Sequence, residues 1–127
     1  MLKQPVELLL PAERNMMLIL RLTTAGVVAR AGLGVDRMDD VKMAVEEACN
    51  CLITEDSAAD QLRLSFVTED NNLIIRICMG EGCSAPAAAE DEMSVVRCIL
   101  ESLVDSVDVR TKDDRLSGVE LRVALGM

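Results

Sequence analysis

One stretch of the chain, residues 39–51, decides the fold, and it reads DDVKMAVEEACNC. Apolar residues recur through it and its flanks at steps of three and four, the spacing that lines up side chains along one face of an α-helix. This apolar stripe consists of Met38, Val41, Val45, Ala48 and Leu52. Glu47 and Cys51 are four residues apart and therefore share a different face, beside the stripe. The stretch predicts a core-packed helix, over about residues 36–53, that presents a carboxylate and a thiol together.

The segment before this helix indicates a strand followed by another helix. Residues 6–10 form a short apolar run, and Pro11 suits the first turn of a helix, where its missing N–H costs nothing. We expect that helix over residues 12–31, with Gly32 as its C-terminal residue. Its predicted core line is Leu18, Leu22, Ala25 and Ala29.

The segment after the central helix indicates two hairpins separated by a third helix. Apolar and polar residues alternate over residues 62–67, Asp70-Asn71-Asn72 is typical of a turn, and residues 73–79 complete the first hairpin. Helical spacing then returns at Met93, Val96, Leu100, Leu103 and Val107. Residues 107–111 and 118–125 predict the closing hairpin.

This order of elements predicts a single domain, residues 1–127, of the α/β class. We expect a two-layer sandwich in which three helices cover one face of a mixed, mostly antiparallel sheet.

Composition and charge exclude several classes of function. The net charge is −9, the Lys and Arg residues are scattered, and Phe66 is the only aromatic residue, so direct nucleic-acid binding is not expected. No apolar stretch reaches the roughly 18 residues of a membrane helix, and the first residues do not resemble a signal peptide. We therefore expect a cytoplasmic protein that does not enter a membrane.

The five cysteines are odd in number and include no C-x-x-C pair, and the chain has no histidine. Mixed Cys/His zinc sites are thus excluded, and we expect reduced, mostly buried thiols and no metal. An all-cysteine metal site, with a structural or metal-linked role, stays open as an alternative.

The central helix resembles the N-box helix of the histidine-kinase-like (GHKL, or Bergerat) ATPases, and the closest branch is the bacterial anti-sigma factors that are also serine kinases. That family carries a Glu as general base and, four residues later, an Asn as magnesium ligand. Glu47 matches the Glu, whereas Cys51 stands in the place of the Asn. The likeness extends from residue 6 to about residue 124.

The other nucleotide boxes of the family are altered in this chain. The family's Asp-x-Gly box, whose Asp accepts a hydrogen bond from the adenine amino group, corresponds here to Gly80-Glu81-Gly82. The stretch that matches the glycine-rich phosphate lid, residues 93–97, contains no glycine. The resemblance therefore implies a degenerate nucleotide site with no bound cofactor.

The function implied by the resemblance is that of an anti-sigma-like regulator, a homodimer that binds a sigma factor or its antagonist without kinase activity. Arg21 lies on the first helix, where family members contact these partners, although a solvated arginine is an equally good interpretation. Glu47 is the general-base position, and a solvated helix glutamate is the simpler interpretation. The alternative function is an active ATP-dependent serine kinase that uses ATP and magnesium with unusual motifs.

Overall fold

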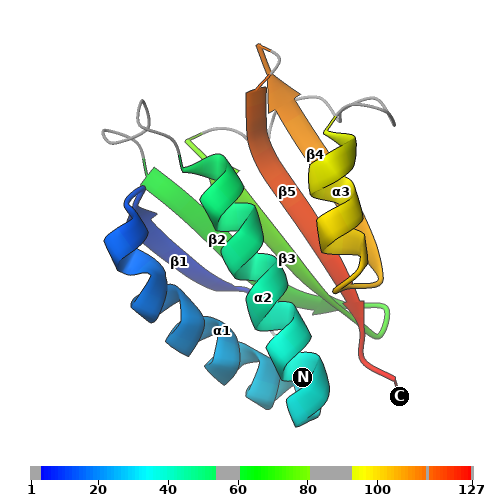
Figure 1. Ribbon diagram of the computed structural model, residues 1–127. Helices are drawn as coiled ribbons and strands as arrows, with labels where there is room; N and C mark the ends of the chain where they lie inside the picture. Colours follow the sequence, from blue (N-terminus) through cyan, green and yellow to red (C-terminus); the bar gives the residue numbers. More distant parts are fainter. Residues whose placement is uncertain (1–3, 54–60, 81–92, 114, 127) are drawn as a thin grey trace.

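The computed structural model describes residues 4–53, 61–80, 93–113 and 115–126. They form a five-stranded sheet in the order β1-β2-β3-β5-β4, and the helices lie together on one of its faces (Figure 1). The two-layer arrangement is confirmed, and every strand pairing is antiparallel, so the sheet is antiparallel throughout rather than mixed. The elements are β1 (Val6–Pro11), η1 (Arg14–Met16), α1 (Met17–Ala31), α2 (Val35–Leu52), β2 (Gln61–Glu69), β3 (Asn72–Met79), α3 (Ser94–Glu101), β4 (Ser106–Lys112) and β5 (Arg115–Ala124).

The β2–β3 hairpin closes at the predicted turn. Asp70 and Asn71 adopt φ values of 49° and 63°, the left-handed conformation that a tight two-residue hairpin turn requires at both positions. Asp and Asn tolerate this conformation better than most residues with a side chain. The Asn72 side-chain amide also donates a hydrogen bond to the Asp70 carbonyl at 3.0 Å. The turn therefore fixes the register of the two central strands.

The helix-facing side of the sheet packs against the apolar stripe of α2. Val41, Val45 and Ala48 are fully buried, and Leu52 is 3% exposed, which confirms the predicted stripe. Met38, at the start of the stripe, is partly buried against the same core. The helix interpretation of residues 39–51 is thus correct in both face and extent.

Helix α1 differs from the prediction in its start and in its buried face. Pro11 pairs with Gln61 as the last residue of β1, so the α-helix begins only at Met17. Leu18 and Leu22, predicted as core, are 63% and 65% exposed. The buried residues of α1 are instead Leu20, Thr24, Val27, Val28 and Ala31. Because the helix is apolar nearly all round, its spacing allowed several core lines and could not select the true one.

Helix α3 is shorter than its sequence spacing predicts. It ends at Glu101, and Val107 faces the core from β4 rather than from a helix. Leu103 and Val107 have the spacing of a helix, but a turn and a strand can place the same two residues inward. The apolar spacing therefore overestimated the length of this helix.

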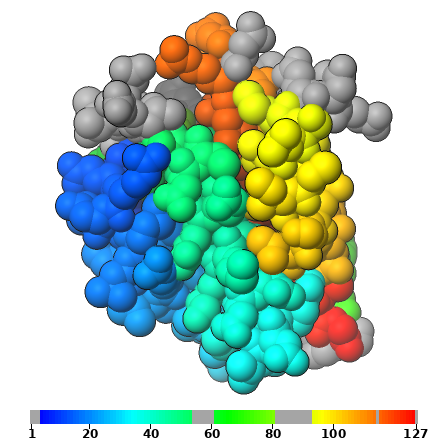
Figure 2. Space-filling model, viewed as in Figure 1, coloured from blue at the N-terminus to red at the C-terminus, as the bar shows by residue number. Residues whose placement is uncertain are grey.

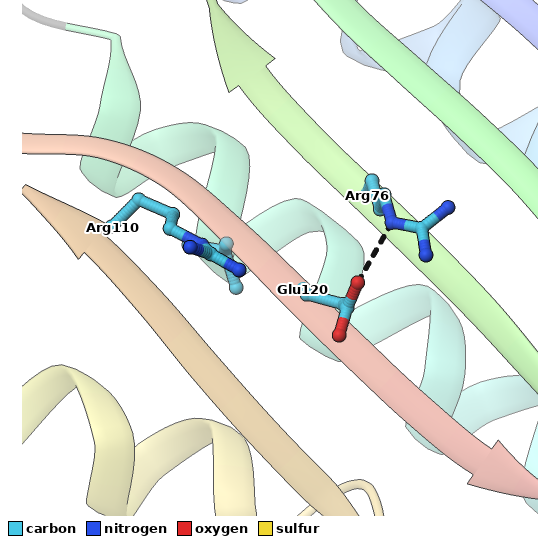
Figure 3. A pocket seen from close by; sticks show the side chains of 4 residues that line it. Arg76, Arg110 and Glu120 are labelled. Carbon is cyan, nitrogen blue, oxygen red and sulfur yellow. Dashed lines mark hydrogen bonds and ion pairs between the residues drawn. The ribbon is translucent and has the colours of Figure 1, made fainter. Parts of the chain in front are cut away.

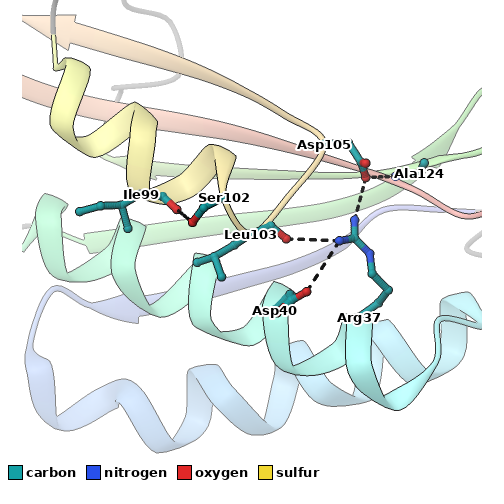
Figure 4. A network of polar contacts seen from close by, with 7 residues as sticks. All are labelled: Arg37, Asp40, Ile99, Ser102, Leu103, Asp105 and Ala124. Carbon is teal, nitrogen blue, oxygen red and sulfur yellow. Dashed lines mark hydrogen bonds and ion pairs between the residues drawn. The ribbon is translucent and has the colours of Figure 1, made fainter.

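Arg37 holds the connection between α3 and β4 against the first turn of α2 (Figure 4). Its Nη2 atom lies 2.7 Å from the Asp105 carboxylate, and Nη1 lies 3.4 Å from the Leu103 carbonyl and 3.9 Å from Asp40. Asp105 in turn accepts a hydrogen bond from the Ala124 N–H at the end of β5. A single cation therefore links α2, the α3–β4 turn and the last strand.

Thr24 offers a test of the buried face of α1. Its side-chain oxygen is buried without a hydrogen-bond partner in the described part of the chain, and the residue is 1% exposed. A buried hydroxyl without a partner costs about 1–3 kcal/mol, and valine has nearly the same shape. We expect Thr24→Val to raise the free energy of unfolding by about 1 kcal/mol in urea denaturation. A loss of stability would mean that the hydroxyl bonds to the helix backbone or to water.

None of the described helices is long and apolar enough to cross a membrane.

Candidate functional site

Glu47 and Cys51 lie on the side of α2 that faces α3. They continue a line, spaced by three and four residues, that begins at Arg37 and Asp40. Since Arg37 contacts the turn that follows α3, this line is turned toward α3. Both side chains are half-buried, and the Cys51 thiol donates a hydrogen bond to Glu47 Oε1 at 3.8 Å. The predicted pairing of carboxylate and thiol is confirmed.

The surroundings of Cys51 keep its thiol protonated. Partial burial raises the pKa of Cys51, the Glu47 charge raises it further, and the hydrogen bond to Glu47 acts in the same direction. Burial also raises the pKa of Cys49, with smaller contributions from Glu46 and Cys51. A neutral thiol is a poor nucleophile and a poor ligand. Cys51 is therefore best explained as a packed thiol rather than a reactive one.

Neutralising Glu47 is expected to activate Cys51. Because the carboxylate disfavours the thiolate, Glu47→Gln should lower the Cys51 pKa and speed its alkylation at pH 8 by about two- to tenfold. Mass spectrometry of iodoacetamide-treated protein measures this, with exposed Cys98 as the internal reference. An unchanged ratio of Cys51 to Cys98 modification would show that Glu47 does not act on the thiol.

Gly80 closes the end of β3. Its φ of 57° lies in the left-handed region, where glycine is favoured, and its N–H donates a hydrogen bond to the Gln61 carbonyl at 3.1 Å. Closing the hairpin end thus accounts for a glycine here without any nucleotide. Glu81 and Gly82, the other two residues of the altered box, lie outside the described residues.

The segments that correspond to the family's nucleotide boxes meet at one end of the molecule. Figure 1 shows the C-terminal end of α2, the end of β3 and the start of α3 at the same end. Helix α3 begins at Ser94 after Met93, whose φ of 54° is left-handed, and no side chain of the described residues caps it. The described part of the chain contains no group of three potential metal ligands.

These residues do not fit a magnesium–nucleotide group. Magnesium prefers oxygen ligands, whereas Cys51 offers a protonated sulfur that is already bonded to Glu47. Gly80 has no carboxylate to accept a hydrogen bond from an adenine amino group.

Arg21 is paired rather than simply solvated. Its Nε donates a hydrogen bond to Glu46 Oε1 on α2, while its side chain remains 54% exposed. The pairing links α1 to α2 on the flank opposite the one that carries Glu47. Sequence reasoning missed it because the spacing within each helix does not set how two helices align.

The cysteines depart from the expectation of five reduced, mostly buried thiols. Cys78 is disulfide-bonded, and Cys98 is exposed on α3. Cys49 and Cys51 are free thiols, as expected. Sequence spacing without a C-x-x-C pair gave no signal for the bond at Cys78.

A small polar pocket lies on the sheet face away from the helices (Figure 3). Arg76, Arg110, Val119 and Glu120 line it, and Arg76 Nε lies 2.7 Å from Glu120 Oε1. Arg76 and Glu120 are directly opposite each other on β3 and β5, so strand alternation could have placed them on one face. Glu120 lies between the two arginines and offsets one of their two positive charges, and the Arg76–Glu120 contact is best explained as a cross-strand ion pair.

The two-layer fold and the helix that carries Glu47 resemble those of the histidine-kinase-like ATPases, and comparisons with known proteins agree. The chain is 32% identical over 76 residues to the serine-protein kinase RsbW of Bacillus thuringiensis, a match that covers 58% of this chain and 48% of that protein. It is 40% identical over 50 residues to RsbW of Bacillus mycoides, covering 39% of this chain and 31% of that protein. The matched part is therefore less than half of each relative. No family model matches the chain.

A solved structure shows the same fold. The structure of the RsbU and RsbW domains of a Mycobacterium tuberculosis protein aligns with a TM-score of 0.72 and 14% identity, covering 96% of this chain and 32% of that one. The resemblance to the anti-sigma factor and serine kinase branch of the histidine-kinase-like ATPases is thus confirmed in sequence and in fold.

Proposed function

We propose that this domain is a cytoplasmic anti-sigma-like regulator that binds a protein partner, a sigma factor or its antagonist, without transferring phosphate. The observation that carries the proposal is the Glu47–Cys51 pair. The general-base position is kept, while the position of the metal ligand holds a protonated thiol bonded to that same base. The fold persists around an altered site, so its surfaces remain available to a partner.

The alternative is an active serine kinase with unusual motifs. In its favour, the sequence relatives are named as serine-protein kinases, and Glu47 is retained. The two proposals differ in nucleotide binding, because a kinase must bind magnesium-ATP and the proposed regulator need not.

The proposed partner-binding face surrounds Arg21 on α1. We also propose that the protein is a homodimer and that the interface between its two copies leaves this face free. Arg21 is more than half exposed although Glu46 holds its Nε, so its terminal nitrogens remain accessible to a partner. A charge-assisted hydrogen bond from arginine contributes about 1.5–3 kcal/mol, roughly ten- to a hundredfold in affinity.

Reversing the charge at Arg21 tests this face. We expect Arg21→Glu to weaken capture of a sigma factor or its antagonist from cell extract at least tenfold. The arginine's charge-assisted hydrogen bond to the partner is lost, and the new negative charge repels the partner group that accepted it. Arg63→Glu, the same change at an exposed position of β2, is the matched control. Equal capture by both variants would exclude the Arg21 face, and capture of neither partner by the wild type would remove support for this pathway.

A further inference from the structure

The open face of the sheet, the face away from the helices, concentrates positive charge in a strongly acidic chain. In Figure 2 the helices lie over the near face of the sheet, so the open face is on the far side. On the strands β3, β5 and β4, alternation of side chains places five cations on the open face: Arg76, Arg110, Lys112, Arg115 and Arg122. Asp108 and Glu120 are the carboxylates of the same area. Five positive charges less two negative ones leave +3 there, whereas the whole chain carries −9.

Lys112 and Arg115 form the cross-strand pair nearest the β4–β5 turn, and they face the same side as Arg110. The next pair inward is Thr111 and Leu116, and Leu116 packs against the core on the helix side. Since successive pairs alternate between the two faces, Lys112 and Arg115 point to the open face. Like charges directly opposite each other on neighbouring strands repel. An anion bound between them relieves that repulsion.

Arg76 and Arg110 supply a second position for an anion, in the pocket of Figure 3. The two arginines lie on either side of Glu120, and the terminal nitrogens of Arg76 point away from that carboxylate. Glu120 lies 2.7 Å from Arg76 Nε and 3.9 Å from Arg122 Nη2, so its charge is shared among several cations. The pocket has a volume of about 40 Å³, which holds about two or three water molecules and therefore suits one carboxylate group.

Protection of the sheet edge explains only part of this charge. Lysine on an edge strand commonly keeps other chains from pairing with it, and this accounts for Lys112 on β4. Arg76 and Arg122 lie on the inner strands β3 and β5, where no edge needs protection. The concentration of cations on these strands therefore favours a binding surface for an anion.

The spacing of the cations suits an extended peptide. Arg110 and Lys112 are two residues apart on β4, roughly 6–7 Å along the strand, and alternate side chains of an extended peptide have the same spacing. A carboxylate matches the first position better than a dianionic phosphate, because Arg76, Arg110 and Glu120 together carry one positive charge.

We propose that the open face over β3, β5 and β4 binds an extended acidic segment of a protein partner, with carboxylates at alternate positions. One carboxylate lies in the pocket of Arg76 and Arg110, and the next lies between Lys112 and Arg115. The inference goes beyond the proposed function, because this surface belongs to the sheet layer and the Arg21 face belongs to the helix layer.

Short synthetic peptides test the surface in the full chain. The chain has no Trp and no Tyr, so the fluorescence anisotropy of a terminal tryptophan on the peptide reports binding without background. The three probes have equal length and carry two Glu at alternate positions, two adjacent Glu, or two Lys at alternate positions. We expect the alternate-Glu peptide to bind about fivefold tighter than the adjacent-Glu peptide, and the Lys peptide not to bind. Arg110→Ala combined with Lys112→Ala should weaken binding of the alternate-Glu peptide about tenfold, because each carboxylate loses a charge-assisted contact.

The matched control is Arg30→Ala combined with Lys42→Ala, which removes two positive charges from the helix layer instead. Circular dichroism checks that each variant is folded. Equal binding of the two Glu peptides, undiminished binding by the Arg110 and Lys112 double variant, or equal loss in both double variants would overturn the proposal. So would stronger displacement of the peptide by phenyl phosphate than by acetate, which would assign the pocket to a phosphate group. A dimer that the Arg110 and Lys112 changes dissociate would overturn it as well, because the face would then belong to a second copy of the chain.

Discussion

Magnesium-ATP is expected not to bind the wild-type protein in calorimetric titration up to about 1 mM, a dissociation constant that corresponds to about 4 kcal/mol. The reason is the joint loss of three sets of contacts. Where the family resemblance places a metal ligand, an adenine acceptor and a glycine-rich phosphate lid, this chain has Cys51, Gly80 and the glycine-free residues 93–97. Binding with micromolar affinity would favour the active kinase instead.

The energies show why the loss should be complete rather than partial. A micromolar site has about 8 kcal/mol of binding free energy. Each lost hydrogen bond to a charged group costs about 1.5–3 kcal/mol, so three losses amount to about 4.5–9 kcal/mol. One altered position would leave weak binding, whereas three together remove most or all of it.

Restoring two of the three contacts tests the assignment. We expect Cys51→Asn combined with Gly80→Asp to tighten magnesium-ATP binding by about 10²- to 10⁴-fold, since two contacts return about 3–6 kcal/mol. Aspartate at Gly80 must adopt a φ of 57°, which it tolerates better than most residues. Cys51→Val combined with Gly80→Asp is the control without a side-chain oxygen at position 51. Equal titrations of the two double variants would show that position 51 is not where the metal ligand was lost.

The sequence predicted those parts of the fold whose residue pattern is compatible with only one local structure. The stripe of α2 is bordered by charged residues, so only one face could be buried, and Asp70-Asn71 is compatible with few structures other than a tight turn. Helix α1 has apolar residues on every side, and its buried face depends on where α2 and the sheet lie. Two residues of its predicted core line, Leu18 and Leu22, are therefore exposed instead.

Like the fold, the candidate site was predictable from the sequence only where a single element determines the contact. The spacing of Glu47 and Cys51 placed them side by side, because both lie on one helix. The Arg21–Glu46 and Arg37–Asp105 pairs join different elements, so they depend on helix alignment and on the turn after α3. Spacing along the chain contains no information on such contacts until the layers are assembled.

The largest effect on stability is expected at Phe66, the only aromatic residue of the chain. It lies on β2 between Val6 and Ile75 of the neighbouring strands, faces the helices, and is fully buried. Removing a buried phenyl ring loses its transfer free energy and leaves a cavity, at a cost of about 3–5 kcal/mol. Since domains of this size have about 5–15 kcal/mol in total, Phe66→Ala should bring the protein close to unfolding at 37 °C.

Urea denaturation followed by far-ultraviolet circular dichroism measures this loss, because the chain has no tryptophan to report on folding. Val67 is the matched control, since it follows Phe66 on the same strand and points to the open face of the sheet, where it is only half-buried. We expect Val67→Ala to cost less than about 1 kcal/mol, because its side chain leaves little cavity behind. The contrast tests the layer arrangement directly, because adjacent residues on a strand face opposite sides of the sheet. Equal losses at the two positions would mean that both faces are covered, and the open sheet face would then have to be an interface.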